Sequence, residues 1–63
     1  MCLAKVYLKR NNNEEFVIAN VTNVDISDGR IIMTTILKEK KELQAAIRMI
    51  DFENSNVFLE GDH

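Results

Sequence analysis

Residues 28–37 read Asp-Gly-Arg-Ile-Ile-Met-Thr-Thr-Ile-Leu, and they give the clearest indication of the fold class. An Asp-Gly pair between apolar segments is a strong signal for a β-hairpin, because glycine adopts positive φ without a steric penalty. The residues that follow it are mostly β-branched, which is typical of strands. We therefore predict a strand over residues 30–37 and, before the turn, another apolar stretch over residues 21–26.

The amino-terminal part of the chain also has the pattern of a hairpin. Residues 2–9 alternate with period two, which indicates a half-buried strand. One face of this strand carries small or aliphatic side chains: Cys2, Ala4, Val6 and Leu8. The polar run 10–13 contains three asparagines, which favour turns, and residues 15–20 form a second short apolar segment. We expect these two segments to pair antiparallel.

Residues 38–52 are consistent with two structures. Apolar side chains at i, i+3, i+4 and i+7 predict a helix: Leu43, Ala46, Ile47 and Ile50. The alternative is a polar loop over 38–41 followed by a strand, which would form a hairpin with residues 56–60 across the turn-forming cluster 53–56. The strand pattern in the rest of the chain favours the second structure. A short helical turn within residues 40–46 is kept as an alternative.

The predicted fold is all-β, with one domain over residues 1–63 built as a small five-stranded antiparallel barrel of the SH3-like or Sm-like kind. A domain of this length buries only roughly 60% of the surface of its unfolded chain. Its one cysteine, Cys2, excludes an intrachain disulfide. A bound metal or a second copy of the chain is therefore the expected source of extra stability.

Composition argues against several classes of function. A net charge of −2 and a pI of about 5.2 make nucleic acid an unfavourable partner, because phosphate binding relies on Lys and Arg. No apolar run approaches the ~20 residues of a membrane span, and a lone thiol without an export signal predicts a cytoplasmic protein. No Gly-rich phosphate loop, Cys-x-x-Cys pair or catalytic triad pattern is present, so we predict a protein that is not an enzyme.

Cys2 is the candidate metal ligand. Removal of Met1 is expected before so small a side chain, and Cys2 would then offer an amine nitrogen and a thiolate sulfur in one five-membered chelate. Such N,S ligands suit Ni(II), Cu(II) or Zn(II). Two Cys2 residues related by a twofold axis could complete one site. The alternative is that Cys2 is a small packing residue of the first strand.

The opening Met1-Cys2-Leu3-Ala4-Lys5-Val6, together with the chain length and the spacing of apolar strands, resembles the CooT family. That resemblance implies a small dimeric accessory protein that supplies nickel, as Ni(II), to carbon monoxide dehydrogenase or another nickel enzyme. It maps the nickel ligand onto Cys2. We place the expected homodimer interface along residues 3–8, with whichever edge strand adjoins them.

Two further features have more than one interpretation. His63, the only histidine, could bind metal, but a frayed terminal residue is the more common case. The Sm-like pattern leaves an RNA-binding module as the alternative function, with Tyr7 and Phe16 available to stack on bases. Glutamates alternate with the lysines around these rings, which favours an ordinary mixed-charge surface.

Overall fold

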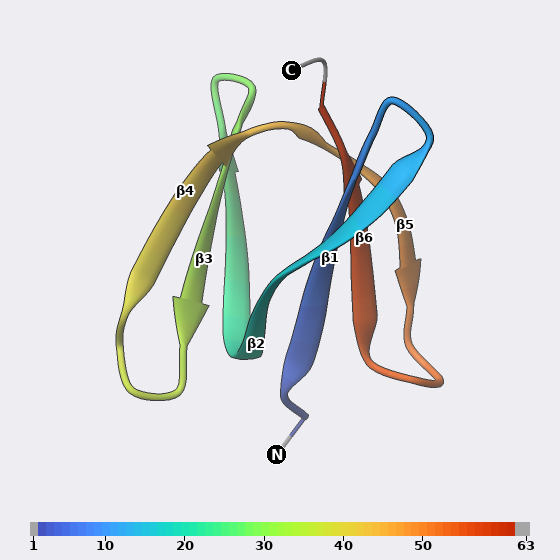
Figure 1. Ribbon diagram of the computed structural model, residues 1–63. Coiled ribbons are helices and arrows are strands. Elements are labelled where there is room, and N and C mark those ends of the chain that lie inside the picture. Colours follow the sequence, from blue (N-terminus) through green and yellow to red (C-terminus); the bar gives the residue numbers. More distant parts are fainter. Residues whose placement is uncertain (1, 62–63) are drawn as a thin grey trace.

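The computed structural model describes residues 2–61, and within them every regular element is a strand (Figure 1). The predicted all-β class is thus confirmed. The strands are β1 (Ala4–Arg10), β2 (Asn13–Ser27), β3 (Arg30–Thr35), β4 (Lys40–Gln44), β5 (Ala46–Asp51) and β6 (Asn56–Glu60). Residues 2–61 contain no helix long and apolar enough to cross a membrane.

All six strands belong to one strongly bent sheet with the order β4-β3-β2-β1-β6-β5. The expected five-stranded antiparallel barrel is wrong in two respects. There is a sixth strand, and β1 pairs parallel to β6, whereas the other neighbours are antiparallel. The edge strands β4 and β5 do not pair with each other, although only Ala45 separates them in sequence, so the sheet remains open.

Both predicted tight turns are confirmed by the backbone. Asn11 and Asn12 have φ of 52° and 68° between β1 and β2. Asp28 and Gly29 have φ of 51° and 76° between β2 and β3. Two successive residues with positive φ match the twist of a two-residue hairpin, and Asn, Asp and Gly tolerate that conformation.

Residues 15–20 and 21–26, expected as separate segments, form the single strand β2. The strand bends at Asn20, where φ is 61°, and its register shifts nearby against both β1 and β3. Irregularities of this kind bend a strand and increase its twist. β2 can therefore pair with β1 along its first half and with β3 along its second half.

Residues 40–44 are a strand, so the helical alternative is wrong. β4 pairs with β3, with Leu43 opposite Ile31. Leu43, Ala45 and Ile47 all pack against the core, which is an alternation of period two that continues from β4 into β5. The wider helical stripe arose because Ala46 and Ile50, which are both exposed, also happen to be apolar.

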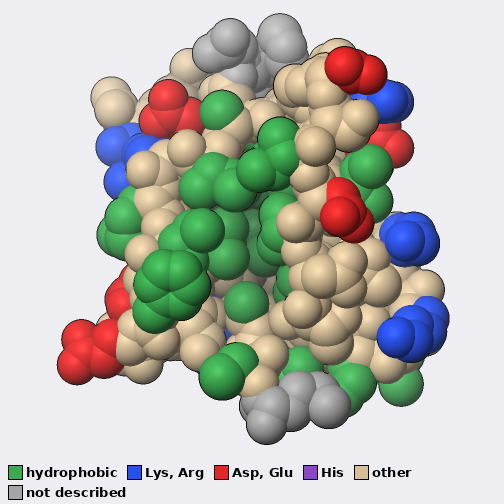
Figure 2. Space-filling model, turned by 180° about the vertical axis from the view of Figure 1, so that it is seen from behind, with side chains coloured by type: hydrophobic (Ala, Val, Ile, Leu, Met, Phe, Trp, Pro, Cys, Tyr) green, Lys and Arg blue, Asp and Glu red, His purple; other side chains and the backbone are tan. Residues whose placement is uncertain are grey.

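The core lies on the inner, concave side of the sheet. Among residues 2–61, seven apolar side chains are buried there: Val6, Leu8, Val21, Ile31, Met33, Val57 and Leu59. So few buried residues make a small core for a free-standing domain. Figure 2 shows further hydrophobic side chains gathered in the middle of a hollowed face, where the open sheet leaves them uncovered.

Candidate metal centre at Cys2

Cys2 lies just before β1, with an exposed, free thiol. The start of β1 is held in place by the β5–β6 turn, residues 52–55, because the backbone N–H of Lys5 donates to the carbonyl of Ser55 at 3.0 Å. Ser55 has a φ of 57°, which lets the turn reverse into β6. The packing alternative for Cys2 therefore does not fit its exposure. The thiol is open to a ligand.

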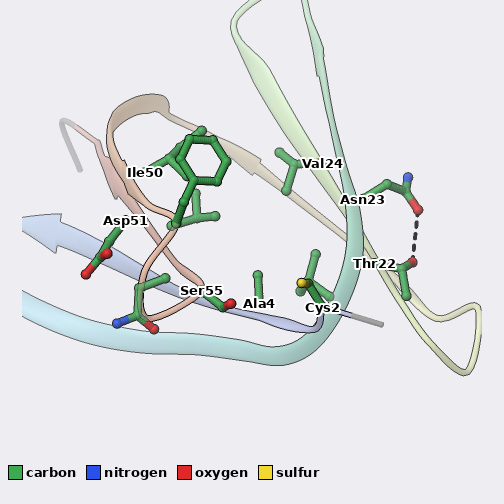
Figure 3. A pocket seen from close by; sticks show the side chains of 12 residues that line it. Cys2, Ala4, Thr22, Asn23, Val24, Ile50, Asp51 and Ser55 are labelled. Carbon is green, nitrogen blue, oxygen red and sulfur yellow. Dashed lines mark hydrogen bonds between the residues drawn. The ribbon is translucent and has the colours of Figure 1, made fainter.

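A cavity of about 270 Å³ opens beside Cys2 on the concave side of the sheet. It is lined by residues from the start of β1, the bend of β2, the end of β5 and the following turn, and the start of β6: Cys2, Ala4, Val21, Thr22, Asn23, Val24, Ile50, Asp51, Phe52, Ser55, Asn56 and Val57. Figure 3 shows Val24 and Ile50 on opposite sides of this cavity. The walls are mostly apolar, and no Lys or Arg is among them.

Asp51 is the one residue with a charged side chain among the described residues of the lining, and it is engaged in the β5–β6 turn. Its carboxylate accepts hydrogen bonds from the Asn54 side-chain amide at 2.9 Å, from the Asn54 N–H at 3.2 Å and from the Glu53 N–H at 3.0 Å. The side-chain and backbone bonds from Asn54 lower the pKa of Asp51 below its usual value. Figure 3 shows this carboxylate turned away from the cavity.

The polar wall on β2 is neutral. The Thr22 hydroxyl lies 3.0 Å from the Asn23 side-chain oxygen and 3.2 Å from the carbonyl of Thr34, where it can donate to either (Figure 3 draws the first contact). None of the described residues that line the cavity has a cationic side chain that could receive an anion. The arrangement suits a thiolate beside an apolar surface, not a phosphate or carboxylate ligand.

Cys2 is the only predicted ligand that falls within the described part of the chain. Residues 2–61 contain no group of three or more His, Cys, Asp or Glu side chains that could hold a metal ion. Met1 and His63 lie outside the described residues, so the expectations about them stay expectations. Sequence reasoning missed Ile50 and Phe52 as neighbours of Cys2, because their proximity depends on the parallel pairing of β1 and β6.

The expected dimer interface along residues 3–8 stays a prediction, but the edge strand that was expected to adjoin these residues is wrong. β1 is an inner strand with β2 and β6 on either side, so no edge strand adjoins it. Leu3 and Tyr7 are half-buried. Tyr7 packs on the outer face against Phe16 and Phe58, with ring centroids 5.9 Å and 5.5 Å away.

The same packing bears on the RNA-binding alternative. Tyr7 and Phe16 do lie together, but in an edge-to-face contact with each other. The adjoining cation, Arg48, lies 5.4 Å from the Phe58 ring centre and forms an ion pair with Glu14 at 2.9 Å. The three rings and Arg48 already contact one another. The cluster therefore provides no specific support for a base-stacking platform.

Comparison with known proteins agrees with the resemblance seen in the opening residues. A family model described as the CO dehydrogenase accessory protein CooT matches residues 1–60. A crystal structure described as a CooT from Carboxydothermus hydrogenoformans superposes with a TM-score of 0.87 at 18% sequence identity, covering 98% of this chain and 100% of that one. Curated proteins yield no match. At that identity the structural match establishes the fold, and the family-model match over nearly the whole sequence shows that the chain belongs to the CooT family of CO dehydrogenase accessory proteins.

Proposed function

We propose that this protein is a non-catalytic nickel-binding accessory protein, which shares one Ni(II) between the Cys2 residues of a cytoplasmic homodimer and supplies it to carbon monoxide dehydrogenase or another nickel enzyme. The observation that carries the proposal is the exposed Cys2 thiol at the mouth of an apolar cavity, in a chain whose family is a CO dehydrogenase accessory family. A buried cysteine would have favoured packing instead.

The chemistry of the donor atoms supports nickel over the hard cations. A thiolate is a soft ligand that suits Ni(II), Cu and Zn, whereas Mg²⁺ and Ca²⁺ prefer oxygen. One Cys2 provides a single thiolate and, once Met1 is removed, one amine. A square-planar ion needs four ligand atoms, so two copies of Cys2 meeting on a twofold axis supply a complete N,S set.

An accessory role also fits the position of the site. Cys2 lies at the molecular surface, ahead of the first strand, and not within the buried core. A metal held there can be approached by a partner protein without unfolding of the sheet. A cargo ion must leave as well as bind, and an exposed ligand at the end of the chain allows both.

The test is a titration of the reduced, tag-free protein with Ni(II), followed by absorbance, beside Cys2→Ser and Thr22→Ser variants. We expect a thiolate-to-nickel charge-transfer band that saturates at about one metal per two chains. The band should be lost in Cys2→Ser and kept in Thr22→Ser, which changes another residue of the same cavity. An equal band in all three proteins would refute Cys2 as the ligand.

A further inference from the structure

The turn between β2 and β3 consists of an aspartate followed directly by a glycine, Asp28 and Gly29. Both residues are exposed, and both have positive φ, 51° and 76°. Figure 1 shows this turn at the opposite end of the molecule from the start of β1, so it is remote from Cys2 and its cavity. The proposed metal site therefore leaves the carboxylate of Asp28 without a role.

We propose that Asp28 is a modification site, at which the folded protein slowly and spontaneously forms isoaspartate. The backbone nitrogen of Gly29 attacks Cγ of Asp28, so that a bond from nitrogen to Cγ forms and the bond from Cγ to the carboxyl hydroxyl breaks. That hydroxyl and the amide proton leave as one water molecule, and a five-membered succinimide remains. Water then opens the ring. Cleavage between nitrogen and Cγ restores aspartate, whereas cleavage between nitrogen and the backbone carbonyl carbon gives isoaspartate.

The two reacting groups have no competing partners. Within residues 2–61, no hydrogen bond or ion pair holds the Asp28 carboxylate, and the Gly29 N–H donates to no acceptor of the protein. In a two-residue hairpin the closing backbone contacts belong to the flanking residues, which here are Ser27 and Arg30. The nitrogen of Gly29 is therefore available as the nucleophile, and the carboxyl of Asp28 is available as its target.

Glycine is the successor residue that least obstructs this ring closure. A Cβ on the residue after the aspartate would crowd the attacked carboxyl, and Gly29 has none. Beyond Gly29 and its two chain neighbours, no atom lies within 4 Å of the position that a Cβ would take. Glycine also changes its backbone angles more readily than other residues. The rotation that brings the nitrogen to Cγ thus has open space on the Gly29 side of the turn.

Two other aspartates of the described chain lack these conditions. Asp25 lies within β2 before the β-branched Ile26, and its carboxylate accepts a hydrogen bond from the Asn23 side-chain amide at 3.3 Å. Asp51 precedes Phe52, and its carboxylate accepts three hydrogen bonds in the β5–β6 turn. Both are internal controls, because they share the solution and the chain but not the free carboxylate or the following glycine.

Isoaspartate at position 28 should loosen the β2–β3 hairpin. It inserts Cβ into the main chain, so the turn gains a backbone atom and no longer fits the twist of a two-residue hairpin. The pair formed by Ser27 and Arg30, which closes the turn, is disturbed first. β3 continues with Ile31 and Met33, whose side chains are 1% and 0% exposed in the core. We therefore expect a less stable sheet with an unchanged Cys2 end.

The experiment incubates the reduced full-length chain at neutral pH and physiological temperature and follows isoaspartate over weeks. Isoaspartate is quantified by methyl transfer from labelled S-adenosylmethionine with an isoaspartyl methyltransferase. Electron-transfer fragmentation of the tryptic peptides 11–30 and 49–63 then separates Asp28 from Asp25 and Asp51. We expect isoaspartate at position 28, background levels at the two control positions, and an intermediate that is lighter by one water.

Two variants test the chemistry. Gly29→Asn should slow the reaction several-fold, because asparagine tolerates positive φ but adds a Cβ. Asp28→Asn should give isoaspartate at the same position faster, since it forms the same succinimide with loss of ammonia. A rate that Gly29→Asn leaves unchanged would count against ring closure at this nitrogen and would overturn the proposal.

The folded state is tested by a parallel incubation in urea. Wild-type protein that forms isoaspartate only when unfolded overturns the proposal, because the native turn would then protect Asp28. Similar levels at Asp25, Asp28 and Asp51 in the folded protein also overturn it. The isoaspartate form, separated by chromatography, should unfold at a lower urea concentration and keep the nickel band of the unmodified protein. Absence of that band in both forms would contradict the proposed function and leave the modification site standing.

Discussion

Tyr7 stacks on Phe58 across the parallel pair of β1 and β6, with ring centroids 5.5 Å apart and ring planes inclined by 20°. The two residues are directly opposite each other in the register of these strands. Phe16 on β2 meets the other side of Tyr7 edge to face. The outer face of the sheet thus has an aromatic row that ties together strands from both halves of the chain.

Phe58→Leu should destabilise the protein by about 1–2 kcal/mol, because it removes both the stack with Tyr7 and the Arg48 cation–π contact. Phe16→Leu should cost less, since it loses only an edge-to-face contact of a ring that is 59% exposed. Urea unfolding followed by circular dichroism gives both values. Equal decreases in the free energy of unfolding for the two variants would show that the Tyr7–Phe58 stack adds no stability to the parallel pair.

Gly29→Ala should destabilise the β2–β3 hairpin by about 1–2 kcal/mol, because φ is +76° at this position and a left-handed backbone is costly for any residue with a Cβ. Beyond Gly29 and its two chain neighbours, no atom lies within 4 Å of the added methyl, so a clash with the rest of the protein cannot contribute. Gly29→Asn is the control and should cost less, since asparagine tolerates this conformation. A larger decrease in stability for Gly29→Asn than for Gly29→Ala would contradict the explanation from the positive φ.

Replacement of Asp51 by Asn should weaken the β5–β6 turn at neutral pH. In the folded protein the hydrogen bonds from Asn54 lower the pKa of the Asp51 carboxyl, so the charged form stabilises the fold. That contribution is fully present above the ordinary pKa of 3.8 and is lost as the pH falls through the lowered value. Wild type and Asp51→Asn should therefore differ in thermal midpoint at pH 7 and converge in strong acid. A difference in thermal midpoint that persists in strong acid would show that the substitution acts through packing and not through the carboxylate charge.

Nickel affinity should rise with pH, because the Cys2 thiol must lose a proton to bind and the metal competes with that proton. Isothermal titration calorimetry in two buffers of different ionisation enthalpy reports the number of protons released per ion. Electrospray mass measurement on the same sample shows whether Met1 is retained. If the site is the predicted N,S chelate, protein that keeps Met1 should bind nickel more weakly.

Local signals accounted for much of the fold. The asparagine-rich and Asp-Gly turns and the β-branched run of β3 were predicted, because their conformations depend on residues close in sequence. The bend at Asn20 could not be predicted, since a left-handed asparagine within a strand has no distinct pattern. β4 was also missed, because its charged sequence Lys-Lys-Glu-Leu-Gln favours a helix until it pairs with β3.

The candidate site was only partly predictable. Cys2 stood out because of its position and residue type. Its surroundings depend on the parallel pairing of the first strand with the last, which brings the β5–β6 turn beside the start of β1. In the sequence, Phe52 is one apolar residue in a polar turn. Only the sheet topology shows that it borders the same cavity as Cys2.

The parallel contact between β1 and β6 also affects how the protein is made. Pairings between remote segments form slowly, and here the first strand must wait for β6, the last strand of the described chain to leave the ribosome. Until then the nascent chain displays the Cys2 thiol on an unfinished sheet, without the cavity beside it. If Cys2 holds the metal as we propose, the site that includes the cavity is complete only after translation, on chains that have folded completely.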